Sequence, residues 1–312
     1  MKNVIITGAT GSVGVSLVER LLKEKINVTV ISRKNGRTAN LPESDLLSVV
    51  YSELDELNKI ELSEKFDVFY HLAWMGTTGA KRDDTELQTK NIRYTLDAVN
   101  LASRLGCDKF IGAGSQAEYG LCDKPLTPDT PAFPFSGYGT AKLAAGQLSR
   151  LKCNQLNINH TWVRILSVFG KYDSEKSIIK YAVNNFRKNK DALFSESTQI
   201  WDFLFSDDAA EALFLIGNSE NTNGKTYVLG SGTGKPLKEY IKEIYSLCDS
   251  TSEIHFGAVP FSQNSVMFLK ADITALHKDV GFEPKTDFKT GIKKIIESEE
   301  QYEKNQYYDS VL

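Results

Sequence analysis

The stretch Val4-Ile-Ile-Thr-Gly-Ala-Thr-Gly-Ser-Val-Gly14 lies at the start of the chain and decides its fold. The apolar run at 4–6 predicts a β-strand, and the apolar residues after the stretch recur at the spacing of an amphipathic helix. These helix residues are Leu17, Val18, Leu21 and Leu22. Glycines at 8, 11 and 14 allow a tight turn, a close backbone approach to a pyrophosphate and close packing of helix on strand. The stretch therefore predicts a helix N-terminus that binds an anion.

Spaced glycines alone also occur at ordinary turns between a strand and a helix. Here a second apolar strand is predicted at 26–31, so the beginning of a βαβ unit is complete and a dinucleotide site is favoured. We expect the loop to supply the cofactor contacts of Gly8, Thr10, Gly11, Ser12, Val13 and Gly14.

The end of the second strand predicts which dinucleotide binds. An Asp or Glu at this place accepts hydrogen bonds from the ribose 2′-hydroxyl of NAD, but the chain has Ser32 and Arg33. A guanidinium pairs well with a 2′-phosphate, so NADP(H) is favoured and NAD(H) stays possible. Arg33 could equally be a solvated loop cation.

Further apolar strands are predicted at 47–51, 68–73, 109–113 and 161–166, with helices around 86–105 and 137–153. This alternation predicts an α/β fold with a Rossmann-type, doubly wound parallel sheet. Beyond about 170 the pattern becomes mixed and irregular, and the last dozen residues read as a helix end with a loose tail.

Two regions are expected from these patterns. Residues 1–168, with a returning segment at about 202–229, are expected to bind the dinucleotide. Residues 169–201 and 230–312 are expected to form a smaller, mixed C-terminal substrate-binding region.

Composition narrows the class of protein. The 312 residues are 41% hydrophobic and 25% charged, with a net charge of −3, which gives no reason to expect nucleic acid or an anionic membrane as partner. The chain has no run of eighteen apolar residues and begins close to its first strand, so neither a membrane helix nor a signal peptide is expected. Four cysteines without a CxxC pattern and four scattered histidines indicate reduced thiols in the cytoplasm and no metal site.

Tyr138 and Lys142 are four residues apart on a predicted helix, so their side chains share a face. An ammonium close to the phenol is expected to lower its pKa and make it a usable acid or base. Ser115, after the fifth strand, could hydrogen-bond the same substrate oxygen. Alone, the pair would be an ordinary surface contact on a helix.

The chain resembles an extended short-chain dehydrogenase/reductase of the NAD(P)-dependent epimerase/dehydratase family, whose members mostly act on nucleotide-linked sugars. The resemblance covers nearly the whole chain and rests on seven motifs in the family's order. They are Thr7–Gly14, His71-Leu-Ala73, Asn91, Gly114-Ser-Gln-Ala-Glu-Tyr-Gly120, Tyr138-Gly-Thr-Ala-Lys142, Arg164-Ile-Leu-Ser-Val-Phe-Gly170 and Asp202-Phe-Leu-Phe-Ser-Asp-Asp208.

The resemblance implies roles for individual residues. Ser115, Tyr138 and Lys142 become the catalytic set, with Tyr138 as acid/base and Lys142 also binding the nicotinamide ribose. Further cofactor contacts are implied for Leu54, Leu72, Ala73, Ile165 and Leu166. His71 is interpreted as a packed residue beside the cofactor, whereas Asn91 could serve either structure or the site. A homodimer that pairs the two helices before and around Tyr138 is also implied.

Departures from the family pattern bear on the reaction. Sugar 4,6-dehydratases of the family carry acidic residues in the two places after the serine or threonine, but here they are Gln116 and Ala117, so dehydration is disfavoured. Reduction of a keto-sugar or epimerisation then remains, and Ser32-Arg33 favours a reductase that uses NADPH. The combination of His71-Leu-Ala-Trp74 with the motif at 114–120 resembles bacterial surface-polysaccharide enzymes, which implies reduction of the C4 keto group of a nucleotide-linked 4-keto-6-deoxyhexose. The alternative is an NAD-dependent nucleotide-sugar 4-epimerase, and a non-catalytic dinucleotide sensor is a more distant one.

The expected substrate contacts are Trp74, Ser115, Gln116 and Ser167. Trp74 replaces a small residue and could shape the sugar pocket or only fill volume. Ser167 and Trp201 replace an asparagine and an arginine that relatives often have, which puts the diphosphate contacts in doubt. Positive charge is then expected from Lys180, Arg187 or Lys270.

Overall fold

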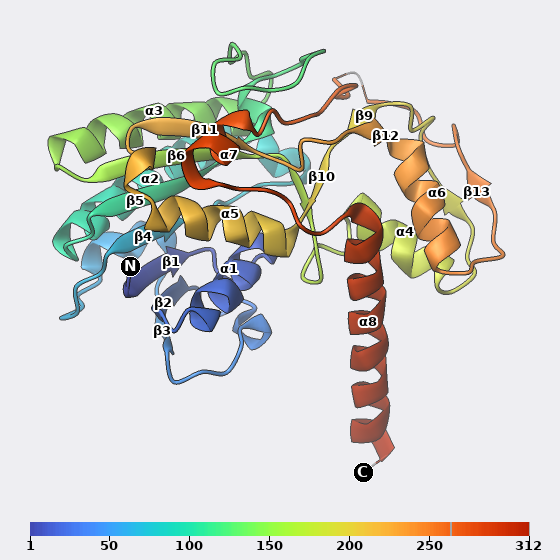
Figure 1. Ribbon diagram of the computed structural model, residues 1–312, viewed down its shortest axis with the longest axis horizontal. Helices are drawn as coiled ribbons and strands as arrows, with labels where there is room; N and C mark the ends of the chain where they lie inside the picture. The colour runs from blue at the N-terminus through green and yellow to red at the C-terminus, as the bar shows by residue number, and fades with distance from the viewer. Residues whose placement is uncertain (263, 312) are drawn as a thin grey trace.

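A parallel sheet of seven strands forms the centre of the molecule (Figure 1). In this computed structural model, which describes residues 1–262 and 264–311, the strand order is β3-β2-β1-β4-β5-β6-β11, and each neighbouring pair is parallel. The strands are β1 Asn3–Thr7, β2 Asn27–Ser32, β3 Leu47–Tyr51, β4 Val68–His71, β5 Lys109–Ser115, β6 Asn159–Ile165 and β11 Lys225–Leu229. The order reverses between β1 and β4, which places a ligand crevice at their carboxyl ends. The predicted doubly wound α/β fold is confirmed.

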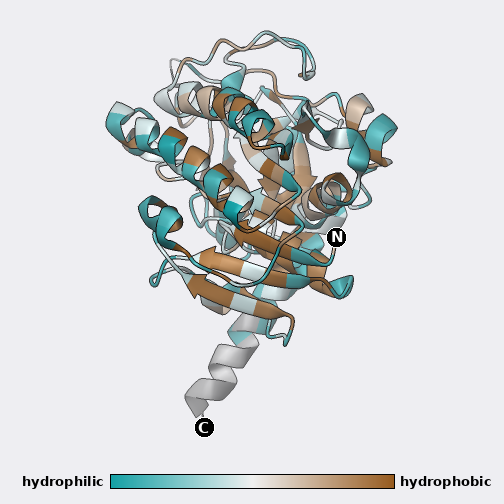
Figure 2. Cartoon of the chain, turned by 90° about the vertical axis from the view of Figure 1, so that its left-hand side faces the viewer, coloured by the Kyte–Doolittle hydropathy of each residue, from teal (hydrophilic) through white to brown (hydrophobic). Residues whose placement is uncertain are grey.

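Helices cover both faces of this sheet. The helices α1 (Ser12–Lys23), α5 (Ser206–Asn218) and α7 (Thr274–Val280) cover one face, and α2 (Thr85–Arg104) and α3 (Gly137–Gln155) the other. Side chains alternate along a strand, so β1 points Val4 and Ile6 to the core under α1 and α5, and Ile5 to the core under α2. Both faces are therefore apolar, and the strands are brown in Figure 2.

A second, smaller group of elements lies beside the sheet. It contains α4 (Ile178–Phe186), α6 (Leu237–Leu247) and the first part of α8 (Phe288–Val311), which enclose a separate aromatic core. Three short strand pairs complete it: β7 (Ser167–Phe169) with β10 (Phe203–Phe205), β9 (Ile200–Trp201) with β12 (Lys235–Pro236), and β8 (Ala192–Leu193) with β13 (Ile254–His255). Short 3-10 helices lie at Thr38–Asn40, Leu54–Lys59, Gly79–Arg82, Gln116–Glu118 and Glu220–Thr222.

Ion pairs connect α4 to α8. The Lys180 ammonium and the Arg187 guanidinium both pair with Glu299, and Arg187 also pairs with Glu303. The backbone of α8 continues to Val311, so the prediction of a loose tail is wrong for these residues, and Leu312 lies outside the described part. A continuous helix was missed because charged and aromatic residues there show no clear apolar period.

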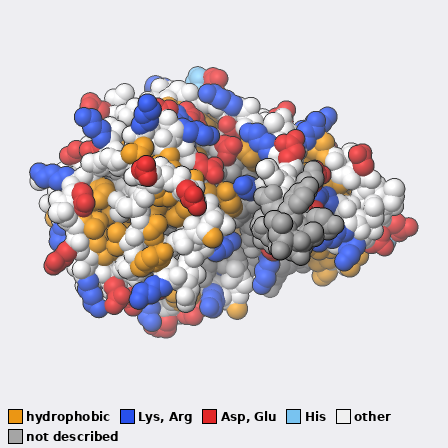
Figure 3. Space-filling model, turned by 90° about the horizontal axis from the view of Figure 1, so that it is seen from below, with side chains coloured by type: hydrophobic (Ala, Val, Ile, Leu, Met, Phe, Trp, Pro, Cys, Tyr) orange, Lys and Arg blue, Asp and Glu red, His pale blue; other side chains and the backbone are white. Residues whose placement is uncertain are grey.

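Acidic and basic side chains are interspersed on the face seen from below, where apolar side chains gather on the wider part of the molecule (Figure 3). Within the described residues, none of the helices combines the length and apolar character needed to cross a membrane. The same residues contain no group of three or more His, Cys, Asp or Glu side chains placed to bind a metal ion.

Candidate active site

The glycine-rich loop between β1 and α1 is shaped by the absence of side chains. Gly8 has a φ of +77°, and a Cβ atom there would lie 2.5 Å from the Ala73 nitrogen. A Cβ atom at Gly14 would lie 2.4 Å from the Gly8 oxygen, whereas one at Gly11 would meet nothing closer than 3.6 Å. Gly8 and Gly14 therefore allow the close packing of the turn, and Gly11 faces open space.

A cavity of about 470 Å³ lies beside this loop at the carboxyl ends of β1, β2 and β4. It is lined by predicted cofactor residues, namely Gly8, Thr10, Gly11, Ser32, Arg33, Leu54, Leu72 and Ala73. Helix α1 begins next to it with no side-chain cap and no acidic residue in its first turn, so its N-terminus offers free N–H groups and positive potential to an anion. These residues fit a pyridine dinucleotide.

The remaining predicted cofactor contacts lie elsewhere. Val13, Ile165 and Leu166 line a second cavity, and Ser12 and Gly14 are among the lining residues of neither cavity. The part of the first cavity near Ser32 carries a residue that the sequence did not single out. Arg37 lines it together with Arg33, while Glu53 adds one carboxylate.

The structure brings Ser115, Tyr138 and Lys142 together. Ser115 ends β5, and Tyr138 lies in the first turn of α3, which Ser136 caps through its hydrogen bond from the Gly139 N–H. The Ser115 hydroxyl is close enough to the Tyr138 phenol to lower its pKa by hydrogen bonding. The Lys142 Nζ donates a hydrogen bond to the Ala113 carbonyl at 2.5 Å, two residues before Ser115.

The pKa of Tyr138 is shifted in the direction opposite to the prediction. Burial raises the pKa of Tyr138, and the groups that oppose this rise are Ser115 and Arg82 rather than Lys142. The Arg82 guanidinium lies 4.4 Å from the centre of the phenol ring, whereas the Lys142 Nζ is 6.0 Å from it. Burial also lowers the pKa of Lys142 to about 7. The expectation that Lys142 lowers the pKa of Tyr138 is therefore wrong for this structure, because burial outweighs attraction across one helical turn.

Trp74 and Asn91 belong to one network between β4 and α2. The Lys142 Nζ lies 3.8 Å from the centre of the Trp74 ring, and the Trp74 Nε1 donates to Gln88 at 2.9 Å. Asn91 accepts a hydrogen bond from the Met75 N–H and donates one to the Met75 carbonyl, both at 2.9 Å. The Asn91 side chain thus holds the segment that follows Trp74, which is a structural role.

His71 is buried between two threonines. Its Nδ1 lies 2.8 Å from the Thr7 hydroxyl, and its Nε2 lies 3.3 Å from the Thr95 hydroxyl. Burial lowers the pKa of His71 to about 3, so the ring is neutral. The interpretation of His71 as a packed residue is confirmed.

Three glycines make room for Trp162 beneath the helix that carries Tyr138. A Cβ atom at Gly112 or Gly114 of β5 would lie 2.2 or 2.4 Å from the indole, and one at Gly146 of α3 would lie 2.7 Å from it. The indole of β6 therefore packs directly against both backbones, and α3 lies close to the end of β5.

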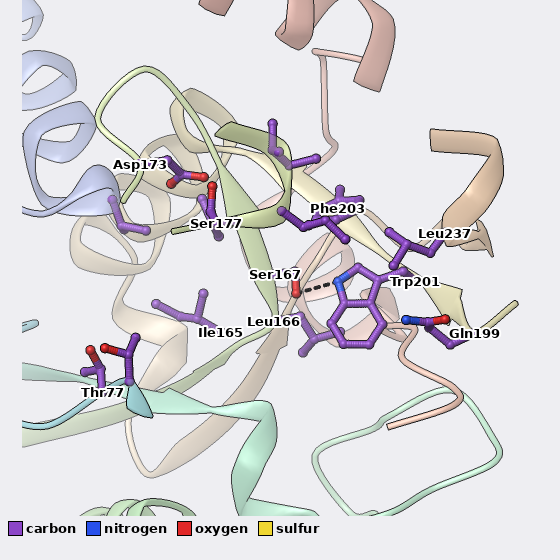
Figure 4. A pocket seen from close by; sticks show the side chains of 15 residues that line it. Thr77, Ile165, Leu166, Ser167, Asp173, Ser177, Gln199, Trp201, Phe203 and Leu237 are labelled. Carbon is purple, nitrogen blue, oxygen red and sulfur yellow. Dashed lines mark hydrogen bonds between the residues drawn. The ribbon is translucent and has the colours of Figure 1, made fainter. Parts of the chain in front are cut away.

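The second cavity, of about 730 Å³, lies between the sheet and the smaller group of elements (Figure 4). Across it the Trp201 Nε1 donates a hydrogen bond to the Ser167 hydroxyl at 2.8 Å. Among its described lining residues Asp173 is the sole ionisable side chain, and burial raises its pKa to about 6. Thr77 lines both cavities.

The three residues that were expected to supply positive charge do not line this cavity. Lys180 and Arg187 pair with carboxylates of α8, and neither they nor Lys270 lines the cavity. The larger cavity also lacks Trp74, Ser115 and Gln116 among its lining residues, whereas Trp74 lines the smaller one. Glu118 and Arg82, which stand beside the catalytic set, were not predicted. Glu118 could have been predicted, because it is a charged residue only two positions after Gln116. The sequence around Arg82 contains no comparable signal.

Comparisons with known proteins show the family of the chain. The model of the NAD dependent epimerase/dehydratase family matches residues 4–230. The CDP-abequose synthase of Salmonella typhimurium is 26% identical over 307 residues, which cover 94% of this chain and 97% of that protein. A putative UDP-glucose 4-epimerase of Methanocaldococcus jannaschii is 23% identical, with 94% and 97% covered.

A solved structure shares the fold. It is an epimerase from Methanothermobacter thermautotrophicus, with a TM-score of 0.87 and 21% identity, covering 97% of this chain and 93% of that one. The family match spans the glycine-rich loop, Ser115, Tyr138 and Lys142. The chain belongs to the NAD dependent epimerase/dehydratase family of extended short-chain dehydrogenases/reductases.

Proposed function

We propose that the chain is a reductase that uses NADPH to reduce the C4 keto group of a nucleotide-linked 4-keto-6-deoxyhexose. Bound NADPH supplies the hydride. Ser115 orients the keto oxygen, Tyr138 donates a proton to the alkoxide, and Lys142 binds the nicotinamide ribose. The high pKa of the buried phenol suits a group that must hold its proton until the alkoxide forms.

The observation that carries this proposal is the set of groups around Ser115. Tyr138 and Lys142 converge on it, but the two residues that follow it, Gln116 and Ala117, offer no carboxyl group. The next residue, Glu118, is fully buried against Arg164. A site with a proton donor and no adjacent carboxyl group favours carbonyl reduction or epimerisation over elimination of water.

NADP(H) is supported by the adenosine end of the smaller cavity. Arg33 and Arg37 both line it, and two guanidiniums outweigh the single carboxylate of Glu53 for a 2′-phosphate. The proposed substrate class is supported by two relatives, 26% and 24% identical, that are both named CDP-abequose synthase. We place the reaction in surface-polysaccharide biosynthesis in the cytoplasm.

A second candidate is an NAD-dependent 4-epimerase of nucleotide sugars. It is supported by the family description and by relatives named as UDP-glucose 4-epimerases. An epimerase recycles its cofactor, so it would hold NAD during purification and need no added reductant.

One assay separates the two. The purified protein is incubated with NADPH and a panel of nucleotide-linked 4-keto-6-deoxyhexoses, and the absorbance of the reduced nicotinamide is followed. Consumption of one NADPH per sugar alcohol formed supports the reductase. A flat trace across the panel, with interconversion of two nucleotide sugars and no added cofactor, would establish the epimerase instead.

The predicted division of labour also enters the proposal. Residues 1–168 with 202–229 bind the dinucleotide, and residues 169–201 and 230–312 bind the nucleotide sugar. The larger cavity supports this division, because Ile165 and Trp201 line it from the two regions.

We propose a homodimer through α2 and α3, since Leu148 and Leu151 of α3 are 42% and 52% exposed. Light scattering of the purified protein tests this, and a monomeric mass would contradict it.

A further inference from the structure

Glu118 is a buried carboxylate without a role in the proposed reaction. Its side chain is 1% exposed and belongs to the 3-10 helix that follows Ser115. Its Oε1 accepts hydrogen bonds from the Ser115 N–H at 2.8 Å and the Trp162 Nε1 at 3.0 Å. Its Oε2 accepts one from the Arg164 Nε at 2.7 Å. Three donors from two neighbouring strands, β5 and β6, thus fix one carboxylate beside the catalytic set.

Stability alone does not account for the buried ion pair of Glu118 and Arg164. Transferring two charges from water to the protein interior costs several kcal/mol per ion, and apolar residues of similar volume often serve a core equally well. What distinguishes Glu118 and Arg164 from an apolar pair is therefore the direction of their hydrogen bonds and the location of their charge.

The hydrogen bonds act on Ser115. Glu118 binds the Ser115 N–H, while the Ser115 Oγ accepts a hydrogen bond from the Ala117 N–H at 3.2 Å. This reciprocal capping box fixes both the backbone and the side chain of Ser115. Because the Oγ is already an acceptor there, its own proton is free to be donated to Tyr138 or to a substrate oxygen.

The charge acts on Lys142. Lys142 is 3% exposed, and its ammonium contacts the Ala113 carbonyl and the Trp74 ring, neither of which is an anion. Around it, His71 is neutral, Tyr138 keeps its proton, and Arg82 lies over the phenol ring. Glu118 and Lys142 bind the same short stretch of β5, because the Glu118 Oε1 accepts from the Ser115 N–H and the Lys142 Nζ donates to the Ala113 carbonyl. The charge of Glu118 raises the pKa of Lys142 against the effect of burial.

We propose that Glu118 is a positioning residue for the reduction proposed above. It fixes the serine that orients the keto oxygen and places a buried carboxylate on the strand segment that binds the Lys142 ammonium, while Arg164 holds that carboxylate in place. This inference rests on the proposed function for its meaning in catalysis, but the charge relation is a property of the protein alone.

The first test needs no substrate. The ionisation of Lys142 is followed by NMR of the protein with ¹³C-labelled lysine side chains, and the Lys142→Arg variant identifies its signal. In Glu118→Gln the amide oxygen still accepts from Ser115, but the charge is gone, so the pKa of Lys142 falls by about one unit. Arg150→Ala, which removes an exposed cation on the outer side of α3, leaves it unchanged.

The variant Glu118→Gln with Arg164→Met guards against a folding failure, because it leaves no unpaired charge in the core. The pKa of Lys142 falls by less in this double variant, because the loss of the Arg164 cation offsets part of the effect. If a folded Glu118→Gln leaves the pKa of Lys142 at its wild-type value, or a folded double variant raises it, the charge relation is overturned.

Kinetics provide the second test. Reduction requires a protonated Lys142, so kcat/KM falls as pH rises through its pKa, and Glu118→Gln moves this fall about one unit lower in pH. A purely structural role would lower kcat/KM equally at every pH, and that result would overturn the positioning role. If wild-type protein reduces no 4-keto sugar while the NMR shift is present, the proposed function fails and the charge relation between Glu118 and Lys142 stands.

Discussion

The ammonium of Lys142 lies 3.8 Å from the centre of the Trp74 indole, and the Tyr138 ring meets the same indole edge-on at 6.1 Å and 86°. The indole therefore contacts both members of the pair that the sequence placed on one helical face. An aromatic face attracts a cation, so Trp74 stabilises Lys142 in a site where burial lowers its pKa. The phenol meanwhile keeps its proton.

Replacing Tyr138 by Phe removes the proposed proton donor and little volume. We expect kcat to fall by about a hundredfold or more, with NADPH affinity nearly unchanged. Stopped-flow reduction and fluorescence titration of NADPH measure the two quantities. Tyr119→Phe is the matched control, since its phenol binds the Thr127 carbonyl and it retains activity. Full turnover of Tyr138→Phe would refute the assignment.

The proposed preference for NADP(H) depends on Arg33 and Arg37. Arg33→Ala should weaken NADPH binding by about tenfold and leave NADH binding nearly unchanged, because a charge-assisted hydrogen bond to the 2′-phosphate is lost. Adding Arg37→Ala should weaken NADPH binding further. The ratio of kcat/KM for the two cofactors measures this, and an unchanged ratio in the double variant would contradict NADP(H).

The carboxyl group of Asp173 makes stability depend on pH. Burial raises its pKa to about 6, so its ionised form is disfavoured in the folded protein, and this cost is present above that pH and disappears as pH falls toward its ordinary pKa. Asp173→Asn should therefore raise the free energy of unfolding by about 1–3 kcal/mol near neutral pH, and by less as pH falls. Urea unfolding at several pH values measures it. The exposed Asp129→Asn is the control, and an equal gain at every pH would contradict the assignment.

Glu299 is the carboxylate that both Lys180 and Arg187 share in the link between α4 and α8. Glu299→Gln should lower the free energy of unfolding by about 2–4 kcal/mol, because Lys180 is 8% exposed and loses its charged partner. Glu56→Gln, which removes an exposed pair with Lys59, should give no detectable change. Urea denaturation followed by tryptophan fluorescence compares the two, and equal stabilities would show that the link is dispensable.

The sequence predicted those parts of the fold that depend on local pattern. The strand at 47–51 has the predicted bounds, and the helices around 86–105 and 137–153 differ from the observed ones by at most two residues at either end. The short strands of the smaller group were missed because two or three residues carry no period. Strand β11 was only implied as a returning segment.

The predicted catalytic residues converge, but their electrostatics could not be read from spacing. The pKa values of Tyr138 and Lys142 are set by burial, which depends on Trp74 and on segments distant in the chain. Lys180 was misjudged for a similar reason, since its partner Glu299 lies 119 residues away. Arg82 reaches the phenol from the short 3-10 helix Gly79–Arg82, whose sequence has no distinctive pattern.

The geometry of the catalytic residues depends on the absence of side chains at the three glycines around Trp162. A methyl group at Gly112, Gly114 or Gly146 would act as a wedge and move the proton donor away from the serine without altering any reacting group. These three glycine positions tolerate no side chain. Substitutions that change the substrate specificity would therefore have to occur in the cavity walls, for example at Trp201 or Asp173.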